Sequence, residues 1–196
     1  MAAKKNRAAV IYYPGKINRR KLSAAVNLTL LPLGWEPTLW LPTSATERGG
    51  AQALRAIAQN ATHILVGGGD GTVREVVEAI TLNGLSDRVT LGILPAGTGN
   101  VLARNLSIDL SDLTTAVKRG LVGNRHPIDL GLARIIFEDG IRAEKVFSVM
   151  AGVGLDGRDH LHQVVQLLHG AGAEDRARHA GVGDDEGHRD AAPSKK

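Results

Sequence analysis

Expected strands and helices alternate along most of this chain, and that alternation constrains its fold more than any other feature. Short apolar runs rich in β-branched residues predict strands, and segments with apolar residues three or four apart predict helices between them. We expect strands at 7–13, 35–41, 62–66 and 89–94, with helices near 21–29, 46–60, 72–82 and 110–119. This order is typical of a parallel α/β sheet with helices on both faces.

The composition divides the chain into two unlike parts. Hydrophobic residues make up 43% of the 196 residues, which is enough to build a core. All six aromatic residues lie before residue 148, whereas five of the seven histidines lie after residue 157. We therefore expect one folded domain at 1–157, ending in a pair of strands at 128–137 and 142–150. Residues 158–196 are an atypical tail, with one short helix near 161–168 and disorder beyond it.

Charge and hydropathy exclude several classes of protein. The chain has no cysteine, which excludes a disulfide scaffold and fits a reducing cytoplasm. No apolar run is long enough to span a membrane. The net charge of +4 is too small to indicate nucleic-acid binding, so we expect no nucleic-acid partner. Residues 1–155 carry 18 Lys and Arg against 12 Asp and Glu, an excess of +6.

A glycine-rich loop with the sequence GGGDGT, residues 67–72, follows the third expected strand and leads into a helix. Its nearly bare backbone can approach a phosphate closely. Thr72 and Glu75 have the spacing of a capping box, which predicts a helix N-terminus favourable to an anion. Asp70 would repel a phosphate unless a cation or a hydroxyl lies between them, so it indicates Mg²⁺ or a proton accepted from a substrate. Alternatively, Asp70 is a turn residue that bonds its own backbone.

A second glycine loop, LPAGTGN at residues 94–100, follows the fourth expected strand. Thr98 and Asn100 could form hydrogen bonds with a nucleotide. The alternative is a helix cap with two packing glycines.

Two familiar phosphate-binding motifs are excluded by their spacing. The P-loop needs a glycine five residues before its Gly-Lys pair and a Ser or Thr after it, and Gly15-Lys16 has neither. The dinucleotide motif G-x-G-x-x-G would need its last glycine at Thr72 or Arg74. An oxidoreductase of that type is therefore disfavoured.

Together, GGGDGT and LPAGTGN resemble the diacylglycerol kinase catalytic domain family, lipid kinases that include the sphingosine kinases. The first loop is shared with the wider superfamily of NAD kinases and phosphofructokinases, whereas the second is typical of the lipid kinase branch. Other matching stretches extend the resemblance over about residues 7–157. It implies a Rossmann-like α/β nucleotide-binding domain, followed in the family by a second, mostly β domain that is missing from this chain.

The resemblance implies an ATP-dependent kinase of phospholipid metabolism that transfers the γ-phosphate to a lipid hydroxyl, such as that of diacylglycerol. Its implied cofactors are ATP and Mg²⁺, with Asp70 as the catalytic residue and magnesium ligand. A lipid substrate implies a cytoplasmic location with peripheral contact at the inner membrane surface. The implied nucleotide-binding residues are Pro14, Gly15, Lys16, Thr43, Gly68, Gly69, Asp70, Gly71, Thr72, Glu75, Gly97, Thr98 and Asn100.

The chain also departs from the family pattern in two places. Tyr13 stands before Pro14 where the family usually has Asn, which removes one amide from the implied nucleotide edge. The family's second domain supplies an acidic general base and much of the lipid pocket. We therefore interpret the chain as truncated or frameshifted after about residue 157 and expect weak or no turnover. The alternatives are a non-catalytic nucleotide-binding remnant and an NAD kinase-type enzyme, and LPAGTGN disfavours the second.

Overall fold

A computed structural model describes residues 5–108, 112–136, 140 and 142–149, together with the backbone of 166–169. Its main part is a four-stranded parallel sheet in the order β2-β1-β3-β4. These strands are β1 (Arg7–Tyr12), β2 (Glu36–Pro42), β3 (His63–Gly68) and β4 (Thr90–Pro95).

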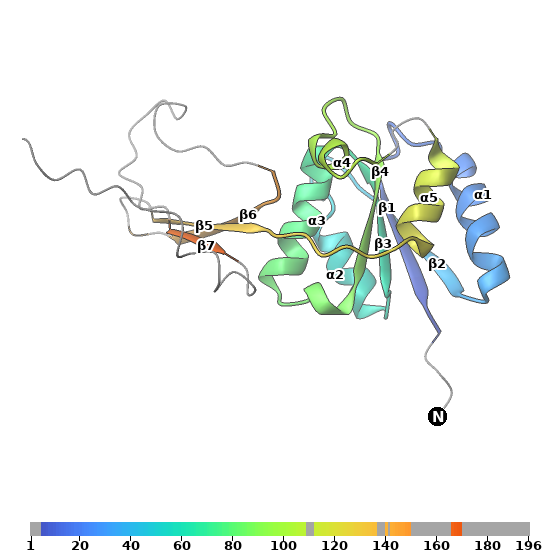
Figure 1. Ribbon diagram of the computed structural model, residues 1–196, viewed down its shortest axis with the longest axis horizontal. Helices are drawn as coiled ribbons and strands as arrows, with labels where there is room; N and C mark the ends of the chain where they lie inside the picture. Colours follow the sequence, from blue (N-terminus) through green and yellow to red (C-terminus); the bar gives the residue numbers. More distant parts are fainter. Residues whose placement is uncertain (1–4, 109–111, 137–139, 141, 150–165, 170–196) are drawn as a thin grey trace, which may run out of the picture.

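Helices cover both faces of this sheet (Figure 1). One face is covered by α1 (Arg19–Leu30) and α5 (Leu113–Val122), and the other by α2 (Gly50–Ala58) and α3 (Asp70–Leu82). Short helices occur at η1 (Leu31–Leu33), η2 (Ser86–Arg88) and α4 (Val101–Asn105). The predicted parallel α/β sheet is confirmed. None of the helices described is long and apolar enough to cross a bilayer.

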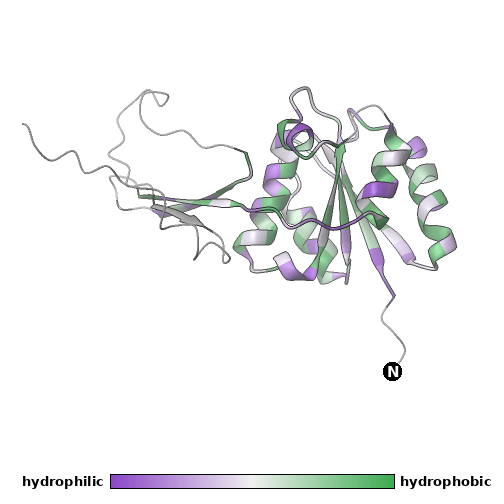
Figure 2. Cartoon of the chain, viewed as in Figure 1, coloured by the Kyte–Doolittle hydropathy of each residue, from purple (hydrophilic) through white to green (hydrophobic). Residues whose placement is uncertain are grey.

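Strand β1 is buried on both sides because its successive side chains enter two different cores. Ala9 and Ile11 pack with residues of α2 and α3, whereas Val10 and Tyr12 pack with residues of α1 and α5. A strand covered on both faces needs apolar residues at every position, which explains why this segment lacks polar alternation. Figure 2 shows these apolar strands between helices that carry both apolar and polar residues.

Proline and glycine lie where the sheet and helices tolerate them. Pro37 lies in β2, an edge strand. The preceding Glu36 N–H donates to the Asn6 carbonyl on the β1 side at 2.9 Å, so the Pro37 nitrogen faces away from β1. Helix α1 begins after Asn18, whose side chain accepts a hydrogen bond from the Lys21 N–H at 3.1 Å. Gly34, with φ of +63°, ends the following η1 turn in the left-handed region that favours glycine.

The capping-box prediction for the first glycine loop is wrong. Helix α3 begins at Asp70, and its N-cap is Gly69, which has no side chain to cap with. Thr72 therefore lies inside the first turn. A Cβ built on Gly68 would lie 2.8 Å from the Thr72 Cβ, so this side chain packs against the loop backbone. The Glu75 carboxylate lies 3.4 Å from the Arg74 guanidinium instead of reaching back to the cap.

A second, antiparallel sheet has the order β6-β5-β7. Its strands are β5 (Gly131–Ile136), β6 (Arg142–Phe147) and β7 (Gln166–His169). The predicted pair of strands is confirmed by β5 and β6. The end of the apolar cluster at 161–168 forms β7, where the sequence predicts a helix, because its backbone pairs with β5. The rest of the tail lies outside the described residues, so its disorder stays a prediction.

Candidate functional site

The loops that carry the candidate site residues all lie at the carboxyl edge of the parallel sheet. Strands β1 and β3 are neighbours, yet β1 leads to β2 on one side and β3 leads to β4 on the other. Ligands of open α/β sheets bind at such a switch point, outside the carboxyl ends of the strands. Tyr13, just after β1, donates its N–H to the Gly67 carbonyl of β3 at 3.0 Å, so the carboxyl ends of these two strands are joined there.

The two glycine loops lie in direct contact. A Cβ built on Gly97 would lie 2.5 Å from the Gly69 Cα and 2.8 Å from the Asn100 Oδ1. No side chain fits between two backbones at that distance. Gly71, by contrast, has nothing within 4 Å of a Cβ built on it. The packing of the protein therefore requires glycine at residue 97. It leaves room for a side chain at residue 71.

Asp70 connects these loops through its side chain. Its Oδ1 accepts a hydrogen bond of 2.7 Å from the backbone N–H of Val101, the first residue of α4. The side chain thus bonds the backbone directly after the other glycine loop, which differs from the local turn contact considered from sequence. Asp70 is exposed and lies in the first turn of α3, where the helix dipole favours a negative charge.

Asn100 braces the second loop from within. Its Oδ1 accepts from the Gly97 N–H and its Nδ2 donates to the Gly97 carbonyl, both at 2.8 Å. Its φ of +48° is a left-handed conformation that Asn tolerates better than most residues. The side chain is nearly buried, so its contacts in this structure hold the loop together. Thr98 in the same loop is exposed.

The remaining predicted nucleotide-binding residues line the same edge at different distances from the glycine loops. Pro14, Gly15 and Lys16 form an exposed turn after β1, next to β3. Thr43 follows β2, two strands from β3 and so about 10 Å away. Its hydroxyl is buried and donates to the Tyr12 carbonyl at 3.3 Å. The turn at residues 14–16 therefore lies close to the glycine loops, whereas Thr43 lies at the periphery of the sheet.

A cavity of about 340 Å³ opens beside Asp70. One wall comes from the starts of α3 and α4, and the other from the end of β6. Its charged residues are Asp70 and Arg74, one helical turn apart on the same face of α3. The rest of the lining is mostly apolar and consists of Gly71, Val73, Val101, Leu102, Phe147, Ser148 and Val149. A molecule with a polar head and an apolar body would fit such a lining.

Phe147 is held in this wall by a glycine on the adjacent strand. Gly131 pairs with Phe147 across β5 and β6, and a Cβ built on Gly131 would collide with the aromatic ring. The ring therefore covers the bare backbone of its cross-strand partner. This contact holds the aromatic ring of the cavity wall against β5.

An ion cluster joins the two cavity walls. Glu78 of α3, whose side chain is only 13% exposed, lies 3.2 Å from the Arg74 guanidinium and 3.4 Å from the Lys145 ammonium of β6. The Arg74 contact is a hydrogen bond, whereas the Lys145 contact is an ion pair without hydrogen-bond alignment. The mostly buried Glu78 carboxylate thus pairs with a cation from each wall. Val146, the residue after Lys145 in β6, packs in the core formed with α2 and α3.

A magnesium ion would find one protein ligand of suitable chemistry here, the Asp70 carboxylate. No group of three or more His, Cys, Asp or Glu side chains gathers in the part of the chain that the structure describes. Mg²⁺ is commonly held by one or two carboxylates together with the phosphates of a substrate. The residues present therefore fit a cation that arrives with a nucleotide and do not fit an independent metal centre.

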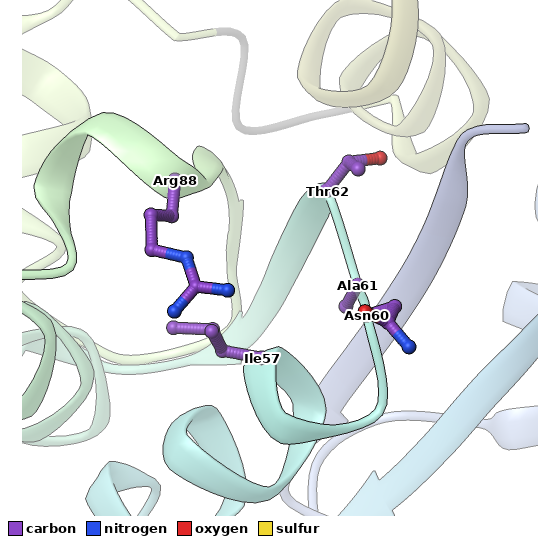
Figure 3. Close-up of a pocket in the computed structure, with 5 residues that line it drawn as sticks. All are labelled: Ile57, Asn60, Ala61, Thr62 and Arg88. Carbon is purple, nitrogen blue, oxygen red and sulfur yellow. The ribbon is translucent and has the colours of Figure 1, made fainter. Parts of the chain in front are cut away.

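The opposite edge of the sheet has a different character. A hollow of about 130 Å³ lies there, lined by Ile57, Asn60, Ala61, Thr62 and Arg88 (Figure 3). It lies at the amino end of β3, away from the glycine loops, and its lining offers one cation and few polar partners. It is therefore a poor candidate for the main site.

A buried histidine lies near the same edge. His63, which is 4% exposed, contacts the Trp35 ring at 4.6 Å between centroids and the Arg125 guanidinium at 3.2 Å. Burial, together with the Arg125 charge, lowers the pKa of His63 to about 4. The imidazole is therefore neutral near pH 7, and it anchors the segment that leads from α5 to β5.

Sequence reasoning missed the second wall of the cavity. Phe147 and Val149 lie 77 and 79 residues after Asp70, and no local pattern connects them. Arg74 lies four residues after Asp70 and so shares its helix face, and this spacing is the sequence signal that points to it. Glu78 follows from the same spacing, one turn further along α3.

Residues 14–133 match the diacylglycerol kinase catalytic domain. This chain belongs to the diacylglycerol kinase catalytic domain family. The match covers both glycine loops, with the contact between Gly69 and Gly97, and reaches the first three residues of β5. The resemblance seen in GGGDGT and LPAGTGN is confirmed.

Individual relatives agree with this assignment. A diacylglycerol kinase of Bacillus subtilis (strain 168) is 35% identical over 127 residues, which cover 64% of this chain and 41% of that protein. A diacylglycerol kinase of Staphylococcus saprophyticus is 32% identical over 132 residues, covering 65% and 41%. A crystal structure of a diacylglycerol kinase from Bacillus anthracis aligns with a TM-score of 0.52 at 17% identity, over 74% of this chain and 65% of that one, which shows a shared fold. The chain thus spans less than half the length of the two curated relatives.

Proposed function

We propose that this chain is the nucleotide-binding part of a lipid kinase that transfers the γ-phosphate of ATP to a lipid hydroxyl such as that of diacylglycerol. The observation that carries the proposal is the meeting of two bare glycine loops at Asp70, beside a mostly apolar cavity. The loops offer backbone N–H groups to phosphates, and the cavity offers apolar surface to an acceptor. Membership of the diacylglycerol kinase catalytic domain family supports both halves of the proposal.

In the proposed reaction one P–O bond forms, one P–O bond breaks and one proton is transferred. The lipid hydroxyl oxygen bonds to the γ-phosphorus, and the bond between that phosphorus and the β–γ bridging oxygen breaks, so that ADP leaves. The hydroxyl proton passes to a base. Catalysis of this kind depends mainly on positioning and on neutralising charge. In this chain the glycine loops would position the phosphates, and Lys16, exposed in the turn next to β3, would supply a positive charge.

Mg²⁺, when bound with the nucleotide, would neutralise charge on the phosphates. Asp70 is the residue that would hold it, through the carboxylate oxygen that does not bond Val101. Asp70 is also the one acid that lines the cavity among the residues that the structure describes, so it is our candidate for catalysis. The lipid acceptor implies peripheral contact with a membrane, and the excess of basic residues before residue 156 would favour an anionic surface.

A nucleotide-binding experiment tests the first half of the proposal. ATP and ADP should raise the unfolding temperature of the chain in the presence of Mg²⁺, because a ligand that binds only the folded state stabilises it. NAD and NADP are the matched comparison. Stabilisation by NADP alone would favour an NAD kinase-type enzyme, and no response to any nucleotide would contradict the proposal.

A pair of substitutions separates the chemical role of Asp70 from its structural one. Asp70→Asn keeps an oxygen that can accept from the Val101 N–H but removes the negative charge, whereas Asp70→Ala removes both. If the charge matters, both variants lose Mg²⁺-dependent ATP binding, and any transfer of radiolabelled phosphate to diacylglycerol in mixed micelles falls in both. Wild-type behaviour of Asp70→Asn would show that Asp70 only braces the loops. ATP binding with no transfer by the wild-type chain would indicate a non-catalytic nucleotide-binding protein.

A further inference from the structure

We propose that Arg74 binds a phosphate group in the cavity and is released from Glu78 to do so. This inference rests on the proposed function, and it assigns a ligand contact to a residue outside the two glycine loops. The phosphate could belong to the nucleotide or to the phosphorylated lipid, and both offer the same chemistry to an arginine. Guanidinium groups bind phosphate through two parallel hydrogen bonds, which a lysine cannot reproduce.

The location of Arg74 supports this role. Arg74 and Asp70 both line the cavity, and they lie one helical turn apart on α3, about 6 Å along the helix axis. A phosphoryl group bound beside Asp70 therefore lies within reach of an extended arginine side chain. Asp70 alone would make this end of the cavity negative, whereas Arg74 supplies the positive charge that a phosphate needs.

Arg74 is held loosely enough to move. Its guanidinium lies 3.2 Å from Glu78 and 3.4 Å from Glu75, but its side chain is 46% exposed. Ion pairs with a solvent-exposed partner are weak because water screens them and both side chains lose freedom. Arg74 makes one contact to each of two carboxylates, and a phosphate in the cavity that accepts two parallel hydrogen bonds can replace them.

Lys145 lowers the free-energy cost of releasing Arg74 from Glu78. A mostly buried carboxylate that loses its sole cation would become an uncompensated charge, which is strongly unfavourable. Here the Lys145 ammonium lies 3.4 Å from the other oxygen of the same carboxylate. Glu78 therefore keeps one cation when Arg74 turns toward the cavity, and the contact between α3 and β6 stays in place.

Binding measurements on the full chain test the inference. We would titrate wild type, Arg74→Gln and Arg74→Lys with tripolyphosphate and ATP, and separately with mixed micelles that contain phosphatidate or diacylglycerol. Arg134→Gln is the matched control, because Arg134 pairs with Glu144 on the exposed face of the second sheet and does not line the cavity. Thermal unfolding would confirm that the variants fold, as expected for a half-exposed side chain.

We expect Arg74→Gln to weaken one phosphate ligand by about tenfold or more, the usual effect of losing hydrogen bonds between charged groups. A loss for tripolyphosphate and ATP would identify the nucleotide phosphate, and a loss for phosphatidate but not diacylglycerol would identify the lipid phosphate. Arg74→Lys should recover only part of the affinity. If Arg74→Gln binds every ligand as Arg134→Gln does, the inference is wrong while the proposed function stands. If the wild type binds none of these ligands, the proposed function fails as well.

A second substitution tests the part played by Lys145. Lys145→Gln should weaken phosphate binding when Arg74 is present, because Arg74 must then remain with Glu78. In the Arg74→Gln background the same substitution should have no further effect, since there is no arginine to release. Such non-additivity is the signature of two residues that act through a shared partner. Additive losses would overturn the release of Arg74 from Glu78.

Discussion

Replacing Gly97 with alanine should separate the two glycine loops and destabilise the domain. The added Cβ would lie 2.5 Å from the Gly69 Cα, whereas carbon atoms in contact prefer about 3.5–4.0 Å. The neighbour is backbone, so no change of rotamer relieves the overlap, and the loops must move apart by about 1 Å. Overpacking of this size costs about 1–3 kcal/mol of unfolding free energy. For a chain of this length that is a fall of roughly 2–12 °C in Tm.

Gly71→Ala is the matched control, because it adds the same atom to the same pair of loops without meeting any neighbour. Gly71 lies in the first turn of α3, where alanine should be more favourable than glycine by about 0.5–1 kcal/mol. Thermal and denaturant unfolding of the two variants should therefore shift in opposite directions. The stabilisation of Gly97→Ala by ATP should also fall, since a displacement near 1 Å is enough to disturb a positioned ligand. A Gly97→Ala variant as stable as the wild type would refute the close approach of the loops.

Three further outcomes follow from contacts elsewhere in the fold. Because the pKa of His63 is lowered to about 4, the unfolded chain binds a proton at pH values where the folded chain does not. Unfolding free energy should fall as pH drops from about 6.5 to 4, by at most about 3 kcal/mol, and His63→Gln should remove that part of the dependence in pH-resolved denaturant titrations. Gly131→Ala should destabilise the chain by displacing the Phe147 ring, and adding Phe147→Ala should cost less in this background than in the wild type, as measured by a double-mutant cycle. Asn18→Ala should lower the unfolding free energy by about 1 kcal/mol because α1 loses its N-cap, and an unchanged denaturation midpoint would contradict this assignment.

Much of the parallel sheet could be predicted because its signals are local. The β-branched run at β3 and the glycines after it are adjacent in sequence, and a strand followed by a tight turn and a helix needs only neighbouring residues. The predicted start of α3, at residue 72, is two residues late because the Thr72 and Glu75 spacing imitates a capping box. The actual cap, Gly69, leaves no side-chain signal.

The cavity could not be predicted in full because its walls come from distant parts of the chain. The sequence predicts Asp70 and Gly97 as site residues because each lies in a glycine loop of recognisable composition. Phe147 gave no such signal, because its place depends on the pairing of β5 with β6 and on the bare backbone of Gly131. Long-range contacts of this kind are decided by tertiary packing and not by local propensity.

The contact between Gly69 and Gly97 has a consequence for how this protein tolerates genetic change. Any coding mutation that replaces Gly97 adds a Cβ, so even the smallest replacement, alanine, meets the opposing backbone. Selection at this position therefore favours glycine because it has no side chain, and no larger residue avoids the contact with Gly69. Gly71 differs, because the protein itself leaves room for a side chain there. In a library of random variants selected for stability, glycine should be enriched at residue 97, while any restriction at residue 71 would come from the ligand.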